Sequence, residues 1–354
     1  EYLSHALNTT PYYKHYDLKY AKELAGVVHH DQLVKLFASL PRLEKRDVKI
    51  HHPKFYSDVI ESIKYTMDTT SGSSGTPLMF PCDNISWAYR HASIFRCFSW
   101  YGISVGDRYG YFFGQHWANL NRLKVQLKDT VFNRIRVSAF ELNLETTPAL
   151  YQKLKAFKPK YLYGYPSAIY SFFRYCHELN IPARQLNLVA VFTTAEPLLD
   201  EQRSFIEGNF GIRCVNMYGS AEGSNTAFEC PAGNLHETID MTLNVYDKVD
   251  ESQSKIYVND LFLNAFPLVN YSLDDYVEKS SRVCDCGRKH PILKAIKGRS
   301  GEPILLPDGR SVNANLPSYV FKNVASGSKI LKYRFYNVQN RKLVLLYEVM
   351  SELT

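Results

Sequence analysis

The order of apolar segments between Tyr161 and Val277 is the feature that most constrains the fold of this 354-residue chain. From Tyr161 to Tyr218, the strand-like runs YLYGY, LNLVAVF and IRCVNMY alternate with amphipathic, helix-like stretches. Such alternation predicts a mostly parallel sheet covered by helices. From His236 to Val277, three further strand-like runs follow one another without a helix. They predict a smaller antiparallel sheet or partial barrel, so the expected class is α/β with a β-rich subdomain.

Residues with helix-boundary preferences flank the helix-like stretches. Ser167 is a candidate N-cap for the helix after YLYGY, and Gly211 is a candidate C-cap for the helix that precedes IRCVNMY. Further helical patterns cover Leu3 to Leu40 and Trp87 to Trp100.

Composition narrows the class of protein. With 45% hydrophobic and 22% charged residues, the chain has the composition of a compact globular protein. Its apolar runs, such as Leu188 to Phe192, are much shorter than the roughly 18 residues that a membrane span needs. Seven cysteines in so long a chain do not form a disulfide framework, and the net charge of +7 is spread along the sequence. We expect a cytoplasmic protein whose partners are small molecules, without nucleic acid or membrane.

Two turns after predicted strands have ligand-binding chemistry. They are TTAEPL at Thr193 to Leu198 and MYGSAEG at Met217 to Gly223. In an open α/β sheet, ligands bind at the carboxyl ends of strands. Tyr218 can lay its ring against a base, and Glu222 can reach a phosphate-bound Mg²⁺. Each turn taken alone also has an interpretation without a ligand, in which Tyr218 is an ordinary core residue and Glu222 a solvated turn residue.

The segment TTSGSSGTPLMF at Thr69 to Phe80 is rich in glycine and hydroxyl residues. It lacks the Gly-Lys-Ser/Thr ending of a P-loop and the Gly-x-Gly-x-x-Gly pattern of dinucleotide-binding folds. Its backbone N–H groups and hydroxyls can still wrap around phosphates. The alternative, a flexible linker, is less suited to a segment that runs straight into PLMFPC.

These motifs together resemble the adenylate-forming enzymes. TSGSSGTP, AEP, YGSAE, the aspartate after NYSLD and IKGR occur in the family's order. The pieces TPYYKHY, NLHETID and CDCGRKHPILKAIKGR are similar to those of the phenylacetate-CoA ligase and capsule-synthesis group of carboxylate ligases. The resemblance covers the chain from about Tyr12 to Tyr347.

The resemblance implies an ATP-dependent acid-thiol ligase. Such an enzyme forms an acyl-adenylate and pyrophosphate from a carboxylic acid, and then transfers the acyl group to CoA. ATP or AMP, Mg²⁺ and CoA are the implied cofactors, and an aryl or other apolar acid is the expected substrate. Acyl transfer to a protein thiol, and a non-catalytic nucleotide-binding member of the fold, remain alternatives. The resemblance leaves a homodimer open.

The resemblance also assigns roles to individual residues. The residues implied to hold the leaving phosphates are Ser71, Gly72, Ser73, Ser74, Gly75 and Thr76. The residues implied around the nucleotide are Ala195, Glu196, Pro197, Tyr218, Gly219, Ser220, Asp275 and Arg299. Tyr218 is expected to stack on adenine, Asp275 to bind the ribose, with Asp274 as the fallback, and Glu222 to hold Mg²⁺.

The sequence departs from the family pattern at two places. Ala221 stands where many relatives have threonine, so a hydroxyl to the α-phosphate is missing, and Ser220 or a water is the expected replacement. The family's catalytic lysine lies far into a small C-terminal domain, and Lys322, Lys329, Lys332 and Lys342 come too early to match it.

The expected domains are residues 1–298, with the β-rich subdomain at about 234–298, and the beginning of a small, mobile α+β domain at 299–354. That domain is expected to be truncated or to have lost the lysine.

The acid pocket is the least constrained prediction. Its candidate lining residues are Phe113, His116, Trp117, Tyr163 and Tyr165. Each of these aromatic residues taken alone also fits an ordinary core position.

Four residues in polar, turn-rich segments form a candidate structural zinc site. They are Cys230, His236, Cys284 and Cys286. Three thiolates and one imidazole make a closed tetrahedral set, as structural zinc requires. The rival ligand is His290, and the alternative without metal is that these cysteines are small buried hydrophobic residues.

Overall fold

The computed structural model describes residues 1–16, 20, 24, 26, 29–70, 78–114, 122–299, 304–305, 311–312, 330–338 and 342–349. The chain divides into two compact units. The large unit comprises residues 1–70 and 78–297, and the small one comprises residues 71–77 and 298–354.

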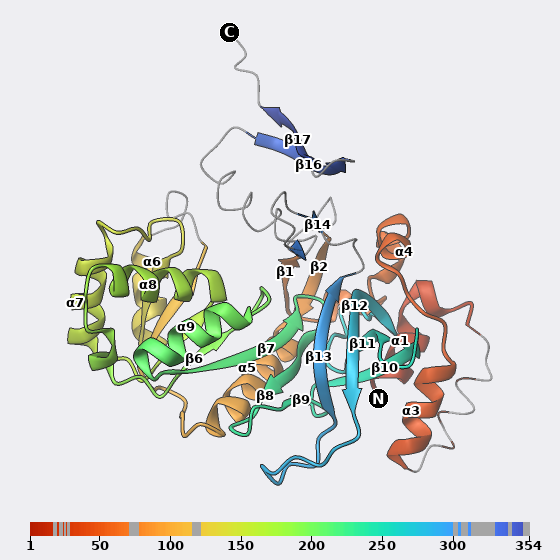
Figure 1. Ribbon diagram of the computed structural model, residues 1–354. Helices are drawn as coiled ribbons and strands as arrows, with labels where there is room; N and C mark the ends of the chain where they lie inside the picture. Colours follow the sequence, from red (N-terminus) through yellow and green to blue (C-terminus); the bar gives the residue numbers. More distant parts are fainter. Residues whose placement is uncertain are drawn as a thin grey trace. The chain divides into compact units, whose positions relative to one another are not determined.

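Among the described residues, an 11-stranded sheet in the order β10-β11-β12-β13-β9-β8-β7-β6-β5-β3-β4 dominates the fold (Figure 1). Its strands are β3 (Tyr109–Phe113), β4 (Arg134–Ser138), β5 (Tyr161–Gly164), β6 (Ala190–Thr193), β7 (Arg213–Ser220), β8 (Ser224–Glu229), β9 (Leu235–Glu237), β10 (Thr242–Lys248), β11 (Ser254–Asp260), β12 (Tyr271–Ser280) and β13 (Ile292–Arg299). From β4 to β7 neighbouring strands pair in parallel. β8 pairs antiparallel with β7 and with β9, and β11 does so with β10 and with β12. The predicted α/β class is therefore confirmed, but the antiparallel strands continue the parallel sheet instead of forming a separate one.

Helices of the large unit cover this sheet. They are α1 (Tyr2–Thr9), α3 (His30–Ser39), α4 (Lys45–Ile50), α5 (Asn84–Ser99), α6 (Arg122–Val131), α7 (Thr147–Phe157), α8 (Pro166–Glu178) and α9 (Asp200–Phe210). Short 3₁₀ turns lie at η1 (Pro11–Tyr13), η2 (His52–Phe55), η3 (Ile60–Ser62) and η5 (Ala183–Leu186).

The parallel strands are buried on both faces, because alternate side chains of a strand point to opposite sides. Leu162 and Val191 face one side, where they share a core with Phe172 of α8. Tyr161 and Phe192 face the other side. There, Phe98 of α5 stacks on Phe192, with ring centroids 4.1 Å apart. Near-continuous apolar runs such as LVAVF are thus explained by burial on two faces.

A second core joins the N-terminal helices to the antiparallel strands. Phe37 of α3 and Val48 of α4 belong to the same buried cluster as Tyr271 of β12. Leu43 also forms a parallel bridge with Tyr271. This packing matters for the site, because it fixes α4 against the β-rich region.

Two local expectations are corrected by the structure. Helix α8 begins at Pro166 and has Tyr165 as its N-cap, so Ser167 lies inside the helix. Proline fixes φ near the helical value and is favoured at the first helical position. The run LNLVAVF is a strand only from Ala190, because η5 precedes it and Asn187 takes a left-handed conformation. The C-cap at Gly211 is confirmed, with a φ of +66°.

Three antiparallel strand pairs lie apart from the main sheet. In the large unit, β1 (Tyr65–Thr69) pairs with β2 (Met79–Asp83), on either side of residues 71–77. In the small unit, β14 (Ile304–Leu305) pairs with β15 (Ser311–Val312), and β16 (Ile330–Val338) pairs with β17 (Lys342–Val349).

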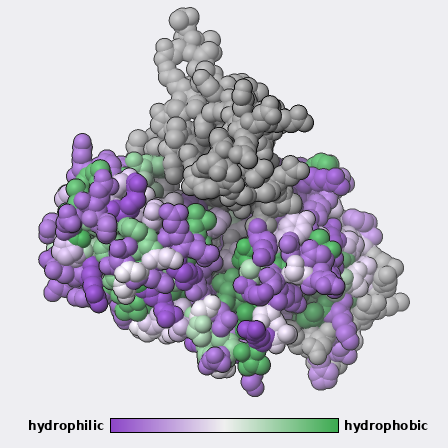
Figure 2. Space-filling model, viewed as in Figure 1, coloured by the Kyte–Doolittle hydropathy of each residue, from purple (hydrophilic) through white to green (hydrophobic). Residues whose placement is uncertain are grey.

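No helix in the described part of the chain is long and apolar enough to cross a membrane. Figure 2 shows that the visible face of the described residues is mostly hydrophilic, with small separated groups of apolar residues.

Gly164, at the end of β5, gives a direct test of the packing between β3 and β5. A Cβ atom added there would lie 1.9 Å from the carbonyl oxygen of Phe112, so one of the two strands must move. We expect Gly164→Ala to lower the free energy of unfolding by about 1–3 kcal/mol, as overpacking does. The control is Gly208→Ala in α9, where nothing lies within 4 Å of the added Cβ. Chemical denaturation measures both variants, and an equal response would contradict the described packing.

Candidate functional site

Tyr218 and Asp275 meet at the carboxyl end of the parallel strands. The Tyr218 hydroxyl donates a hydrogen bond of 2.8 Å to Oδ2 of Asp275. Tyr218 lies near the end of β7 and Asp275 lies in the middle of β12, so the tertiary fold brings together two residues that are distant in sequence. Both side chains are half-buried, which leaves them access to a ligand.

A shift in strand register separates the roles of Asp274 and Asp275. The pairing of β11 with β12 shifts between Lys255 and Tyr257, and Asp274 has a φ of +59°. Such a bulge re-aims the side chains next to it. Asp274 lies 3.6 Å from the Lys255 ammonium, whereas Asp275 contacts Tyr218. The structure thus places Asp275, and not Asp274, at the tyrosine.

Strand β7 continues through Ser220 and forms a hairpin with β8, whose tip carries Glu222. Gly219 is required by this hairpin, because a Cβ atom there would lie 2.1 Å from the carbonyl oxygen of Ser224. The hydroxyl of Ser220 accepts a 2.7 Å hydrogen bond from the Gly223 N–H. Gly219, which the resemblance placed around the nucleotide, is therefore required by the close approach of the neighbouring strand.

Glu222 is buried, with 7% of its side chain exposed, and it has two polar neighbours. The Tyr271 hydroxyl donates to it at 3.1 Å, and the Lys45 ammonium lies 3.6 Å away. Lys45 also donates a 3.4 Å hydrogen bond to the hydroxyl of Thr70, the residue directly before the Gly/Ser loop. A carboxylate and an ammonium group are therefore held beside the neck of that loop.

Sequence reasoning missed Lys45. It is the first residue of the short helix α4 and lies far in sequence from every ligand-type motif. Nothing in its local pattern distinguishes it from the surface lysines of the chain. Only its burial, with 12% of the side chain exposed, and its contacts with Glu222 and Thr70 identify it.

The turn after β6 is held by its own glutamate. Ala195 has a φ of +67°, and the carboxylate of Glu196 accepts a 3.3 Å hydrogen bond from the N–H of Ser167 in the first turn of α8. A carboxylate in this position also interacts favourably with the helix dipole. Glu196 thus fixes the turn that contains Pro197 against α8, a role that the sequence did not indicate.

Three of the aromatic candidates lie together. The ring centroid of Phe113 is 5.3 Å from that of Tyr163 and 4.8 Å from that of Tyr165. Tyr111, which was not predicted, stacks on Phe113 at 4.3 Å. Burial raises the pKa of Tyr163, so its hydroxyl is neutral. The group forms an aromatic wall at the carboxyl ends of β3 and β5.

Several predicted site residues lie outside the described residues. These are Ser71, Gly72, Ser73, Ser74, Gly75, Thr76, His116 and Trp117. Arg299 ends β13, but its side chain is outside the description.

The four predicted zinc ligands form one cluster. The ligand atoms of Cys230, His236, Cys284 and Cys286 all lie within 4.8 Å of one another. The sulfurs of Cys230 and Cys284 are 3.6 Å apart, and the Cys286 sulfur is 3.4 Å from Nε2 of His236. Tetrahedral zinc with Zn–S of about 2.3 Å and Zn–N of about 2.0 Å requires S···N distances of about 3.5 Å and S···S distances of about 3.8 Å. The two distances above lie within about 0.2 Å of these values, so the residues present fit the metal.

Neighbouring groups orient the imidazole and the thiols. Nδ1 of His236 donates a 3.0 Å hydrogen bond to the carbonyl oxygen of His290, which leaves Nε2 to face Cys286. Nδ1 of His290 donates a 2.9 Å hydrogen bond to the carbonyl oxygen of Glu237, and this rival ligand is not among the residues whose ligand atoms gather in the cluster. Burial raises the pKa of Cys230 to about 11. For Cys286 the opposing hydrogen bonds with Arg288 outweigh burial and lower the pKa to about 6.

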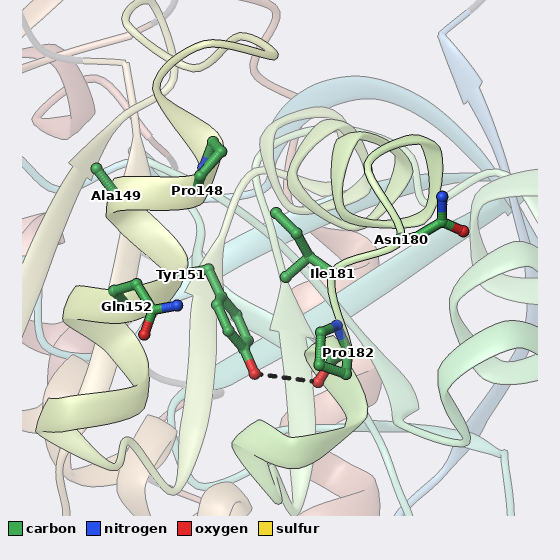
Figure 3. Close-up of a pocket in the computed structure, with 7 residues that line it drawn as sticks. All are labelled: Pro148, Ala149, Tyr151, Gln152, Asn180, Ile181 and Pro182. Carbon is green, nitrogen blue, oxygen red and sulfur yellow. Dashed lines mark hydrogen bonds between the residues drawn. The ribbon is translucent and has the colours of Figure 1, made fainter.

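A shallow pocket of about 330 Å³ lies elsewhere, between α7 and the segment after α8 (Figure 3). Its lining residues are Pro148, Ala149, Tyr151, Gln152, Asn180, Ile181 and Pro182. The Tyr151 hydroxyl is directed across it to the carbonyl oxygen of Pro182, 3.3 Å away. None of the predicted site residues lines this pocket.

The fold resembles solved structures of a CoA ligase. A crystal structure of 2-hydroxyisobutyryl-CoA ligase in the postadenylation state, in complex with R3-HIB-AMP, matches with a TM-score of 0.69 and 18% identity, over 98% of this chain and 75% of that one. An open conformation of the same ligase, in complex with 2-HIB-AMP and CoA, matches with a TM-score of 0.65 and 18% identity, over 98% and 77% of the two chains. The chain therefore has the fold of the adenylate-forming ligases, and the resemblance indicated by the motifs is confirmed at this level.

The amino-acid sequence is also similar to that of a curated protein. Protein CapK of Staphylococcus aureus is 24% identical over 276 residues, which make up 74% of this chain. The chain spans 59% of the length of CapK. No family model matches the sequence.

Proposed function

We propose that the protein is an ATP-dependent ligase that activates a carboxylic acid as an acyl-adenylate and transfers the acyl group to CoA. The observation that carries this proposal is the contact between Tyr218 and Asp275 at the carboxyl end of β7. An aromatic ring beside a carboxylate suits adenosine, because the ring can stack on the base while the carboxylate accepts hydrogen bonds from the ribose hydroxyls. The fold of the adenylate-forming ligases supports the same assignment.

The second half of the nucleotide site is charged. Glu222 would hold Mg²⁺, which neutralises charge on the phosphate oxygens when bound. Lys45 supplies a positive charge between Glu222 and Thr70, beside the neck of the loop that would bind the phosphates. Ser220 replaces the missing hydroxyl at Ala221, since its oxygen accepts from Gly223 and its own proton can be donated. The roles of residues 71–76 with the phosphates and of Arg299 with the ribose rest on the family resemblance alone.

Such a site can lower the activation barrier mainly by positioning. A carboxylate attacks the α-phosphate only when the two are held in line, and the charge that develops on the phosphate oxygens must be stabilised. Lys45 and the loop donors would stabilise that charge, while Tyr218 and Asp275 hold the nucleoside still. CoA as the acyl acceptor is supported by the CoA-bound structure of 2-hydroxyisobutyryl-CoA ligase.

Nucleotide binding tests the proposal most directly. We expect isothermal titration calorimetry to detect MgATP and AMP binding to the protein. Asp275→Ala should weaken binding about tenfold or more, because a charge-assisted hydrogen bond contributes about 1.5–3 kcal/mol. Tyr218→Ala should have a similar effect through lost stacking, which contributes about 1–3 kcal/mol. Tyr218→Phe is the matched control, since it keeps the ring. Absence of binding at millimolar nucleotide would refute the proposal.

The acid substrate is proposed to be aryl or otherwise apolar. The wall formed by Tyr111, Phe113, Tyr163 and Tyr165 offers ring faces at the carboxyl ends of β3 and β5. Ring faces bind apolar groups by burial of apolar surface. His116 and Trp117 remain candidates for the acid pocket on their sequence alone.

Pyrophosphate release, measured over a panel of aryl, fatty and sugar-derived acids, identifies the class of acid. We expect the highest kcat/KM with an aryl acid. Phe113→Ala should lower that value about tenfold or more, because a buried Phe side chain contributes about 1.5–3 kcal/mol. The same variant should leave AMP binding unchanged. A strict preference for a small polar acid would contradict the assignment.

We also propose that Cys230, His236, Cys284 and Cys286 hold a structural zinc ion. The support is that their four ligand atoms lie within 4.8 Å of one another and that the hydrogen bond of Nδ1 fixes the tautomer of His236. The set is closed, with four protein ligands, so the metal would stabilise the fold and take no part in the reaction. It would join the segment after β8 to the segment before β13.

Metal analysis of protein purified without chelator should give about one zinc per chain. His236→Gln should lower both zinc content and melting temperature, because binding energy at such a site becomes folding energy. His290→Gln is the matched control and should retain the metal, since His290 is not one of the four residues whose ligand atoms gather in the cluster. Well under one zinc per chain in the unaltered protein, or equal loss in the two histidine variants, would exclude the proposed ligand set.

A further inference from the structure

A buried carboxylate outside the predicted site collects the polar contacts of three elements. Asp260, at the end of β11, has 1% of its side chain exposed. Its Oδ2 accepts hydrogen bonds from Nη2 of Arg90 at 3.0 Å and from the hydroxyls of Ser86 and Ser224. Its Oδ1 accepts from the N–H of Phe262 at 3.0 Å. A buried charge is tolerated only when it is paired and hydrogen-bonded, and Asp260 meets both conditions.

One arm of this network reaches the hairpin that carries Glu222. Ser224, two residues after Glu222, has a φ of +55°, which is unfavourable for a residue other than glycine. The hydrogen bond from its hydroxyl to Asp260 holds this conformation at the base of the hairpin. Ser224 also pairs with Ser220 across the hairpin, so its position sets where the tip projects.

The other arm reaches the neck of the Gly/Ser loop. Arg90 of α5 has 7% of its side chain exposed, and its Nη1 lies 3.8 Å from Oδ2 of Asp68 in β1. Two residues further along, the N–H of Thr70 donates to the carbonyl oxygen of Leu78 at 3.0 Å. The N–H of Leu78 in turn donates to the hydroxyl of Thr70 at 3.0 Å. These two bonds close the neck on either side of residues 71–77.

We propose that the Asp68–Arg90–Asp260 network is a positioning device, which sets the distance between the loop neck and the hairpin that carries Glu222. Lys45 already connects Thr70 to Glu222 directly. The Lys45 connection alone would let the loop neck and the hairpin pivot about it. The second connection, through Arg90 of α5, fixes the distance between them. The network touches neither the nucleotide nor the acid in the proposed function, so its members act only through the residues they hold.

Asp68 is the member of the network that can be substituted with the least risk to the fold. Removing Asp260 or Arg90 would leave a buried charge without its partner and would destabilise the whole fold. Asp68 is 23% exposed, and its Oδ2 lies 3.8 Å from Nη1 of Arg90, so this contact is an ion pair that is too long for a hydrogen bond. Asp68→Asn therefore removes the attraction to Arg90 while it keeps the size of the side chain.

Helix α5 also provides a matched control. Arg96 forms two hydrogen bonds with Asp240, at 3.0 and 2.6 Å, and this pair is more exposed, at 34% and 43%. Asp240→Asn thus neutralises the partner of an α5 arginine, as Asp68→Asn does, but at a place that contacts neither the loop neck nor the hairpin.

The experiment combines amide hydrogen exchange with calorimetry on the full chain. In Asp68→Asn we expect faster exchange at the Thr70 and Leu78 amides. We expect MgATP binding to weaken roughly twofold to fivefold, the size of a partly exposed ion pair, with adenosine binding unchanged. If Asp68 only stabilised the fold, Asp68→Asn would change the affinities for MgATP and for adenosine to the same extent. Asp240→Asn should behave as the unaltered protein in all three measurements.

The outcomes distinguish this inference from the proposed function, on which its nucleotide readout rests. If the unaltered protein binds no MgATP, the proposed function fails, and exchange at Thr70 and Leu78 alone decides whether Asp68 holds the neck. Unchanged exchange in Asp68→Asn, or an equal effect of Asp240→Asn, overturns the inference.

Discussion

Strand β7 pairs in parallel with β6 and antiparallel with β8, and the candidate site depends on this one change of direction. The carboxyl ends of parallel strands lie on the same side of a sheet. After each such strand, the chain therefore needs a crossover connection to return to the start of the next one. After β7 it instead reverses at once, in a hairpin, and enters the antiparallel strands. The tip of that hairpin carries Glu222, and its base carries Tyr218. The reversal thus brings a ligand-type turn next to β12 and Asp275.

Buried polar contacts hold this arrangement more specifically than apolar packing does. Apolar burial is non-directional, so it fixes which faces of the sheet and helices meet but leaves their fine placement loose. The contacts of Asp260 and Lys45 are directional, and they connect segments that start from α4, α5, β8 and β11. Each of these groups would cost free energy if it were buried without its partner. In our proposal Asp260 never touches the ligand, whereas Lys45 both holds the loop neck beside Glu222 and acts on the phosphates.

The cysteine-histidine cluster shows which part of a metal site a local sequence pattern can predict and which part it cannot. The polar character of the two cysteine segments predicted the residues that gather there, and the structure brings all four together. Sequence distance favoured His290 as a rival, because it lies close to Cys286. The antiparallel pairing of β9 with β13 decides otherwise, since it sets His236 opposite Ile292 and so brings its ring to Cys286.

The sequence by itself determined the alternation of strands and helices and the end of α9 at Gly211, because each depends on the period or conformational preference of neighbouring residues. It placed the turn after β7 too early, at Met217, whereas the strand continues through Ser220. The family motif selected Asp275 with Asp274 as the fallback, but only the tertiary structure decided that Asp275 meets Tyr218. It alone also decided that Glu196 accepts a hydrogen bond from the first turn of α8, and that Lys45 and Asp260 belong beside the site. These contacts join residues distant in sequence, through strand register, a bulge and helix packing. No local pattern encodes such contacts, because a shift of one residue in register turns a side chain to the opposite face.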